Sequence, residues 1–220
     1  MQTLVFTVKG AYARFRCPHT TTSALTFLCI HPIAVKGLIG AVLGIEYDDL
    51  HENLKNTKIG IQVLNTIHKD TQSFNLIAQS NNNKAANFQS RVQFLRDVKY
   101  RIFVSDESRK LESLDGVLKS REYIFTPYLG CSEHIAKIEY EEMTLAKACS
   151  DQTADTIIPK QNMVPDFKED VPVYMDRIPI KNSRDREYTE YSNVVFAIST
   201  PITIKGCEIF KVGERNVFFF

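Results

Sequence analysis

The stretch HPIAVKGLIGAVLGI, residues 31–45, decides the fold, because it predicts a helix that is buried nearly all round. Proline has a fixed φ and no amide donor, so Pro32 suits the first turn of a helix. From Pro32 to Ile45 every residue is apolar or glycine except Lys36. A helix that is apolar on all faces must lie inside the protein, packed against other elements.

Three glycines, Gly37, Gly40 and Gly44, follow at spacings that place them on one face of this helix. Glycine inside a helix costs about 1 kcal/mol relative to alanine, so we expect something to approach the backbone closely there. The run is too short and too charged to cross a membrane, which takes about 20 apolar residues. Two interpretations remain open: a core helix lying on a sheet, or the same helix with an anion site at its N-terminus, near Lys36.

The composition is that of a globular protein that needs neither disulfide bonds nor a structural metal ion for stability. The chain has 220 residues, of which 44% are hydrophobic and 24% charged, so it can form one elaborated domain or two small ones. The five cysteines are odd in number and widely spaced, and the N-terminus does not resemble a signal peptide. We therefore expect free thiols, a cytoplasmic protein without contact to a membrane, and no metal or other cofactor.

The charge distribution says more than the net charge of +1, which excludes a globally basic nucleic-acid binder. Residues 1–45 contain the cations Lys9, Arg14, Arg16 and Lys36 but no acidic residue, and the first acid is Glu46. Such a segment predicts a local basic face that can bind RNA while other surfaces contact proteins.

The periodicity along the chain predicts an α+β fold with a ferredoxin-like domain, an inserted hairpin and a β-rich C-terminal extension. A polar, asparagine-rich segment at about 70–93 has too few apolar residues for a core of its own and predicts a projecting hairpin. We expect two regions, 1–142 and 143–220. The predicted strands are 2–9, 58–68, 92–105 and 134–141, the predicted helices are 31–45 and 109–121, and the predicted C-terminal strands are 171–180, 187–199, 202–212 and 216–220.

The loop after the first strand carries the strongest binding signal. Arg14 and Arg16 share a face if the loop is extended, and arginine forks suit phosphate groups. Neighbouring aromatic residues can stack on bases, although a solvated basic face is the plain alternative. In the polar hairpin, the cations Lys84 and Arg91 can contact RNA phosphates and Phe88 can insert between bases. The alternative for this segment is a disordered loop. The predicted RNA-binding residues are Tyr12, Arg14, Arg16, His19, Lys36, Gly37, Lys84, Phe88 and Arg91.

No sequence motif indicates an enzyme. P-loop, GxSxG, HExxH and paired metal-ligand patterns are absent, so no catalytic residue and no metal ligand is predicted. Tyr47, just past the glycine-rich helix, has three interpretations: a general acid, a stacking partner for a base, or a residue that closes the helix against the sheet.

The segments FTVKGAYARFRCP, HPIAVKGLIGAVLG and YIFTPYLGCSE, in this order, resemble the fifth CRISPR-associated (Cas) family of the RAMP superfamily. The resemblance covers roughly the first 140 residues, and its general look is nearest to type I-B interference complexes. It implies a non-catalytic subunit that holds the 5′ handle of the crRNA, with a thumb hairpin across the RNA. It also implies contacts with backbone subunits, which the protein would cap, and with the large PAM-reading subunit, and an indirect link to target DNA.

Two alternatives to this function stay open. The type I-C branch of the same family cleaves precursor crRNA without a metal, using Tyr, Lys and His, and Tyr47 lies about where that branch has its tyrosine. No adjacent Lys-His pair follows in the expected segment, since His68-Lys69 has the wrong order and place. A protein-only scaffold, whose basic loop meets an acidic partner, is the second alternative.

Overall fold

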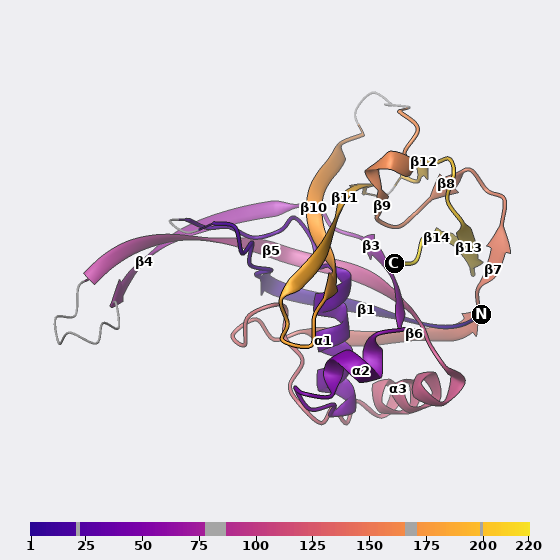
Figure 1. Cartoon of the computed structure of the whole chain (residues 1–220), viewed down its shortest axis with the longest axis horizontal. Coiled ribbons are helices and arrows are strands. Elements are labelled where there is room, and N and C mark those ends of the chain that lie inside the picture. Colours follow the sequence, from indigo (N-terminus) through magenta and orange to yellow (C-terminus); the bar gives the residue numbers. More distant parts are fainter. Residues whose placement is uncertain (21–22, 78–86, 166–170, 199) are drawn as a thin grey trace.

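An antiparallel sheet with two helices on one face forms the centre of the protein, which is described by a computed structural model (Figure 1). The structure describes residues 1–20, 23–77, 87–165, 171–198 and 200–220. The four central strands lie in the order β3–β5–β1–β6, each antiparallel to its neighbour. This is the strand order of a ferredoxin-like fold, and the predicted α+β class is confirmed. The core elements are β1 (Gln2–Ala13), α1 (Pro32–Leu43), β3 (Lys58–Val63), β5 (Asn87–Ser105), α3 (Ser108–Ser120) and β6 (Lys137–Leu145).

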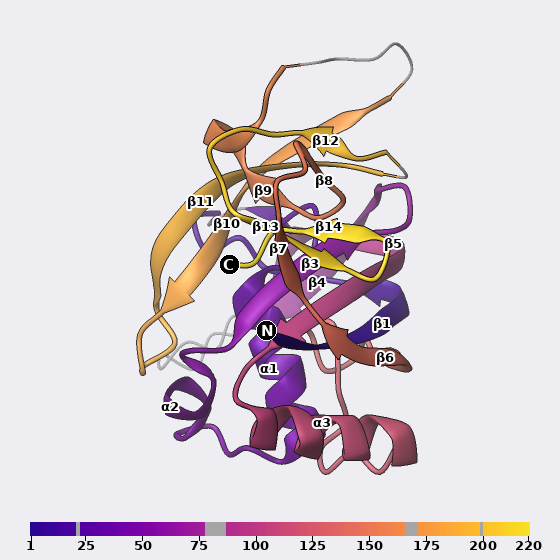
Figure 2. The ribbon, with the colours of Figure 1, turned by 90° about the vertical axis from the view of Figure 1, so that its right-hand side faces the viewer.

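The two faces of the sheet are covered by different parts of the chain. On one face α1 and α3 pack against alternate residues of the strands, and α3 buries a stripe of Leu111, Leu114 and Leu118. On the other face, Val5 and Phe103 pack against strands from the end of the chain. Figure 2 shows the helices on one side of the sheet and these C-terminal strands on the other.

Helix α1 is capped at both ends by its own sequence. The His31 side chain accepts a hydrogen bond from the Ala34 amide, and Gly44 ends the helix in the left-handed conformation. The expected close approach to the glycine face is confirmed at Gly40, where an added Cβ would meet Leu50 Cδ1 of α2 (Leu50–Leu54) at 2.3 Å. It is wrong at Gly37, which has open space in front of it.

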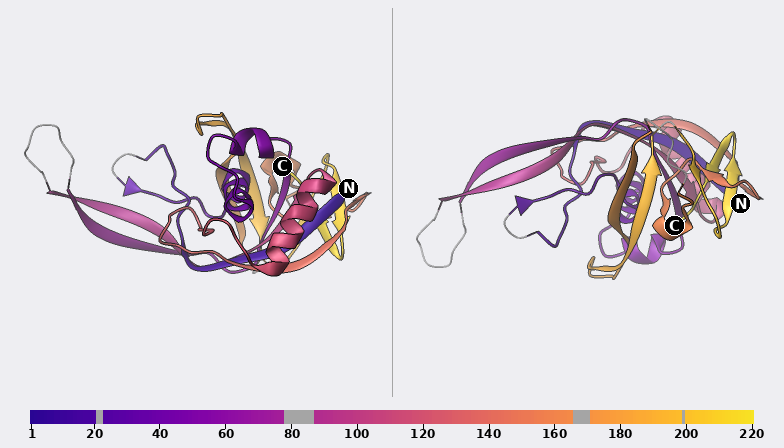
Figure 3. Two further views of the ribbon diagram at one scale, coloured as in Figure 1. Left: turned by 90° about the horizontal axis from the view of Figure 1, so that it is seen from below. Right: turned by 90° about the horizontal axis from the view of Figure 1, so that it is seen from above.

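The predicted hairpin is present and projects from the body as a thumb (Figures 1 and 3). Strand β4 (His68–Ile77) pairs antiparallel with the first half of β5, and β2 (Ser23–Ala24) pairs with the other edge of β5. Asp97, whose φ is 54°, lies between the thumb and the part of β5 that lies in the central sheet. Lys84 lies outside the described residues.

Strand β1 is longer than predicted. Gly10 does not end it, because the ladder to β5 continues as far as Ala13, opposite Leu95. The following segment is also tied down rather than being a free loop, since Arg16 forms an isolated bridge with Thr26. Strand β6 runs through the expected division between residues 142 and 143.

The C-terminal region is rich in strands, as predicted. Its β10–β11 hairpin packs against α1, and side chains from β9 to β11 belong to the same hydrophobic cluster as the central sheet. None of the helices within the described ranges is long and apolar enough to cross a membrane. The elements are β7 (Lys147–Cys149), β8 (Thr153–Ala154), β9 (Ile158–Pro159), the 3-10 helix η1 (Lys160–Asn162), β10 (Val173–Asn182), β11 (Tyr188–Ala197), β12 (Ile202–Thr203), β13 (Ile209–Val212) and β14 (Arg215–Val217).

Candidate nucleic-acid interface

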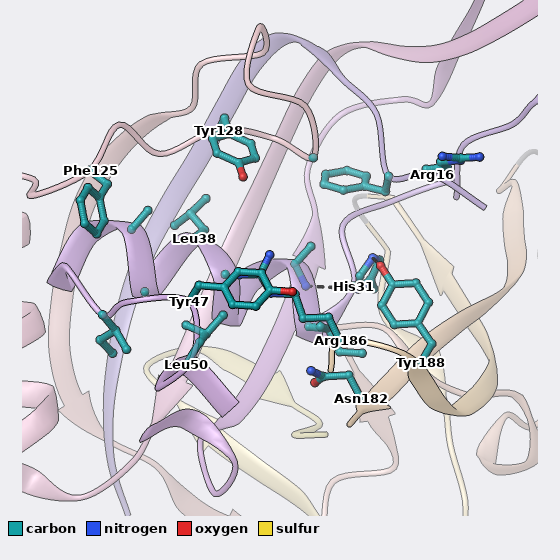
Figure 4. Close-up of a pocket in the computed structure, with 18 of the residues that line it drawn as sticks. Arg16, His31, Leu38, Tyr47, Leu50, Phe125, Tyr128, Asn182, Arg186 and Tyr188 are labelled. Carbon is teal, nitrogen blue, oxygen red and sulfur yellow. Dashed lines mark hydrogen bonds between the residues drawn. The ribbon is translucent and has the colours of Figure 1, made fainter. Parts of the chain in front are cut away.

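A cavity of about 590 Å³ opens beside α1 and is lined by four separate parts of the chain (Figure 4). The open space in front of Gly37 belongs to this cavity. Its wall is mainly apolar and aromatic, with arginine, asparagine and histidine side chains among them. The lining residues are Arg14, Phe15, Arg16, His31, Ile33, Ala34, Gly37, Leu38, Gly40, Ala41, Ile45, Glu46, Tyr47, Leu50, Phe125, Thr126, Tyr128, Gly130, Asn182, Arg186 and Tyr188.

The turn 126–130, TPYLG, positions the first arginine of the cavity. The Arg14 amide donates a hydrogen bond of 3.0 Å to the Leu129 carbonyl. Gly130 has φ +87°, and an added Cβ would lie 1.9 Å from the Arg14 carbonyl oxygen. Only glycine permits both this backbone conformation and this contact. Helix α1 and this turn, two of the three segments on which the family resemblance rests, therefore meet at one cavity.

Three arginines, Arg14, Arg16 and Arg186, give the cavity its positive charge. None of them forms an ion pair with another described residue. Arg14 Nε is buried without a hydrogen-bond partner among the described atoms. The Arg186 guanidinium lies 3.7 Å from the centroid of the Tyr47 ring in a cation–π contact, and the two side chains overlap in the view of Figure 4. Free guanidinium groups around one cavity suit the binding of phosphate groups.

His31 is a structural element of this site. Its side chain is only 2% exposed, its Nδ1 accepts from the Ala34 amide at 3.2 Å, and its Nε2 lies 3.5 Å from the Tyr188 hydroxyl. Burial lowers the pKa of His31 from 6.5 to about 3, so the ring is neutral at physiological pH. A neutral ring can accept the hydrogen bond from the helix, which an imidazolium cannot.

The structure brings some of the predicted residues together and separates others. Arg14, Arg16 and Gly37 line the cavity, as expected from an extended backbone at 14–16. Tyr12 lies at the root of the thumb, where its ring contacts Phe94 and His134. Three further predicted residues lie away from the cavity lining: His19 is exposed beside Tyr191, Arg91 is exposed on the thumb, and the backbone of Phe88 lies opposite Leu76 in the thumb ladder.

Lys36 does not share a groove with the two arginines, and that geometric expectation is wrong. It lines a neighbouring cavity of about 350 Å³ with Lys55, Lys58 and Lys181, and its Nζ donates to the Lys55 carbonyl at 3.3 Å. Burial lowers the pKa of Lys36. A helical turn places Lys36 on a different face of α1 from Gly37, which explains the separation.

The N-terminus of α1 also offers fewer free amides than expected for an anion site. Pro32 has no amide hydrogen, the Ala34 amide is bound by His31 Nδ1, and the Val35 amide donates to the His31 carbonyl. Of the first-turn amides, that of Ile33 is the one left. The positive charge of the cavity therefore comes from arginine side chains rather than from the helix terminus.

Sequence reasoning missed the part of the site that comes from the C-terminal half. Asn182, Arg186 and Tyr188 belong to the β10–β11 hairpin, which packs against α1. The sequence feature that could have indicated them is the polar segment 182–188, NSRDREY, which contains two arginines and lies where two predicted strands meet. Its great distance from α1 along the chain gave no indication that the two meet.

Tyr47 does not close α1 against the sheet, because 54% of its surface is exposed and it packs under Arg186. Within the described ranges, no group of three His, Cys, Asp or Glu side chains is close enough to hold a metal ion.

The fold, with its thumb and the cavity between α1 and the TPYLG turn, defines a RAMP-type ferredoxin-like protein. The family described as CRISPR-associated protein (Cas_Cas5) matches residues 3–195. The chain therefore belongs to this family.

Two solved structures show the same fold over nearly their whole length. One, described as "CRISPR RNA-guided surveillance complex", is 13% identical, with a TM-score of 0.58, and the match covers 90% of this chain and 91% of that one. The other, a CRISPR protein from Archaeoglobus fulgidus, is 12% identical, with a TM-score of 0.54 and coverage of 99% and 98%. No curated protein is significantly similar to the chain in sequence.

Proposed function

We propose that this protein is a non-catalytic RNA-binding subunit of a type I CRISPR surveillance complex, of the I-B kind, and that it holds the 5′ handle of the crRNA. In this role it caps the filament of backbone subunits and contacts the large subunit, and target DNA is reached indirectly through the complex. The family membership supports a place in a CRISPR system. The likeness in fold to a CRISPR RNA-guided surveillance complex supports the choice of RNA as ligand.

One observation carries the proposal: Arg14, Arg16 and Arg186 surround a largely apolar cavity and have no carboxylate partner among the described residues. Guanidinium groups at the rim suit the phosphates of a single strand, and an apolar, aromatic wall suits its bases. About 590 Å³ is more than one nucleotide needs, so the cavity can take a bent piece of the strand.

The test is the salt dependence of RNA binding. The full chain is titrated with a single-stranded RNA that carries the 5′ handle of a CRISPR repeat, at several NaCl concentrations. Release of counterions by three arginines gives a slope of log K against log salt of about −2, from about 0.7 for each neutralised phosphate of a single strand. Arg16→Gln is expected to reduce the slope by about 0.7.

Arg109→Gln serves as the matched control, because Arg109 is an exposed arginine on α3 that does not line the cavity. It is expected to leave both affinity and slope unchanged. Absence of RNA binding, a flat salt dependence, or equal losses for the Arg16 and Arg109 variants would overturn the proposal.

Metal-independent cleavage of precursor crRNA is the second candidate. It is favoured by the position of Tyr47, an exposed tyrosine with Arg186 over its ring, at the edge of the cavity. Against it stands the state of the other candidate acid–base group in the cavity, since the His31 nitrogens are both turned to other residues. Incubation of the protein with repeat-containing RNA and EDTA separates the two candidates. A discrete product that is lost in Tyr47→Phe would establish cleavage.

A further inference from the structure

Four aromatic rings lie in a row at the root of the thumb, outside the cavity. Tyr12 of β1 and His134 both contact Phe94 of β5, with centroid distances of 6.4 and 5.4 Å, and Phe74 of β4 lies 6.1 Å from Phe94 on the thumb. These contacts are edge-to-face, while Tyr12 and His134 are tilted at 34° and 6.1 Å apart. We call Tyr12, Phe74, Phe94 and His134 the aromatic row.

The strand register puts the row on one face of the thumb. Phe94 lies opposite Asp70, and Phe74 four residues further along β4 lies on the same face, because side chains alternate along a strand. Phe94 is the buried member of the row, whereas Phe74 is 38% exposed. Among the described rings, Phe94 is the aromatic partner of Phe74, and the two ring planes meet at 61°. The row thus has a buried base and an open aromatic end.

The aromatic row begins where the cavity ends. The Leu129 amide donates to the His134 carbonyl at 2.8 Å, and the Leu129 carbonyl in turn accepts from the Arg14 amide at 3.0 Å. One side of this short hydrogen-bonded chain is Arg14, in the cavity wall, and the other side is His134, in the row. A strand held by the arginines of the cavity therefore has a direct continuation onto the thumb.

Two buried polar atoms at this junction have no partner among the described residues. They are Arg14 Nε, which is a donor, and His134 Nε2. A buried polar atom without a hydrogen bond destabilises the folded protein unless a ligand or water satisfies it. A nucleotide that enters between these side chains offers partners for both, since its phosphates accept and its base edges donate and accept hydrogen bonds. An apolar peptide segment would leave both unsatisfied.

We propose that the aromatic row binds unpaired nucleobases of a single RNA strand by stacking, directly after the strand leaves the arginine-lined cavity. An exposed cation also lies next to the row: Arg96 is opposite Tyr12 in the ladder, on the same face, and its Nε lies 3.5 Å from the Asp97 carboxylate. Stacking requires no particular base, so the row adds affinity for single-stranded RNA of any sequence. This inference rests on the proposed function.

The experiment uses a mixed-sequence single-stranded RNA that carries one 2-aminopurine, placed at each position in turn. Stacking on an aromatic ring quenches the fluorescence of this base, so binding is expected to quench it at one or two adjacent positions. Phe74→Ala is expected to remove the quenching there and to weaken binding about tenfold, in the range known for loss of one stacked base. Phe74→Trp is expected to retain both.

Two further variants separate stacking from other roles of the thumb. Ile77→Ala is the matched control, because Ile77 is 68% exposed on the same strand but on the opposite face. It is expected to leave affinity and quenching unchanged. Phe74→Leu keeps an apolar side chain and removes the ring, so it is expected to behave like Phe74→Ala.

The outcomes distinguish this inference from the function on which it rests. If RNA binds with the expected salt slope but without quenching, and Phe74→Ala has no effect, the stacking inference is overturned. The proposed function then still stands. Full RNA affinity of Phe74→Leu together with loss in Phe74→Ala would assign an apolar contact, as in protein docking, and would equally overturn the inference. Absence of RNA binding by the unaltered protein overturns both.

Discussion

Replacing Gly130 by alanine is the sharpest test of how the cavity is held together. At φ +87° an L-residue is strained by about 1–2 kcal/mol, and the new Cβ would lie 1.9 Å from the Arg14 carbonyl oxygen. Relief of that clash requires the two backbones to separate, which also loses the 3.0 Å hydrogen bond from Arg14 to Leu129, about 1 kcal/mol. We therefore expect the free energy of unfolding to fall by about 3 kcal/mol in Gly130→Ala.

Urea denaturation followed by circular dichroism measures this loss, and thermal unfolding is expected to shift down by about 6–12 °C for a chain of this length. Gly37→Ala is the matched control within the same cavity. Its Cβ would meet nothing within 4 Å, and alanine is the better helix former, so we expect a gain of about 0.5–1 kcal/mol. Equal effects of the two substitutions, or a loss below about 1 kcal/mol in Gly130→Ala, would refute the reasoning.

Two more predictions concern stability. Burial lowers the pKa of His31 to about 3, so below pH 6.5 the imidazole is protonated in the unfolded chain but stays neutral in the folded protein. The free energy of unfolding is therefore expected to fall by about 2 kcal/mol between pH 6.5 and pH 5. Urea titrations at both pH values measure this loss, and His31→Asn, which keeps a capping acceptor, is expected to reduce it. On the face of the sheet that also carries Val5 and Phe103, Arg101 Nε donates to both Glu141 oxygens at 2.9 and 2.8 Å and its Nη1 donates to Gln62, with both ionic side chains mostly buried. A double-mutant cycle with Arg101→Met and Glu141→Gln is expected to give a coupling of about 1–2 kcal/mol, and additive effects would contradict it.

The sequence predicted the central fold well because its signals are local. The glycine-rich helix, the leucine stripe of α3 and the alternating strands each carry their own period, and the βαββαβ order follows from them. The extent of β1 was wrong because glycine favours chain breaks on its own, whereas Gly10 is held in the strand by its partner β5. Local propensity carries no information about such pairing.

The candidate site could be predicted only in part, for a related reason. Arg14, Arg16 and Gly37 were found because they lie in two neighbouring segments whose residue types suit phosphate. Arg186 joins them through tertiary packing of a hairpin against α1, which no spacing in the sequence encodes. Lys36 was misplaced because periodicity gives the face of a helix but not which face meets which neighbour.

Because β5 is continuous, the thumb is anchored at one end in the central sheet. The strand runs without interruption from the thumb into the sheet, and β4 with its ten residues spans about 30 Å. The backbone at Asp97 is held by a hydrogen bond of 2.8 Å from the side-chain amide of Asn65 to the Asp97 carbonyl. A rotation of about 10° at this position would move the far end of β4 by about 5 Å, so the ladder of β1 and β5 around Asp97 determines where the thumb can reach.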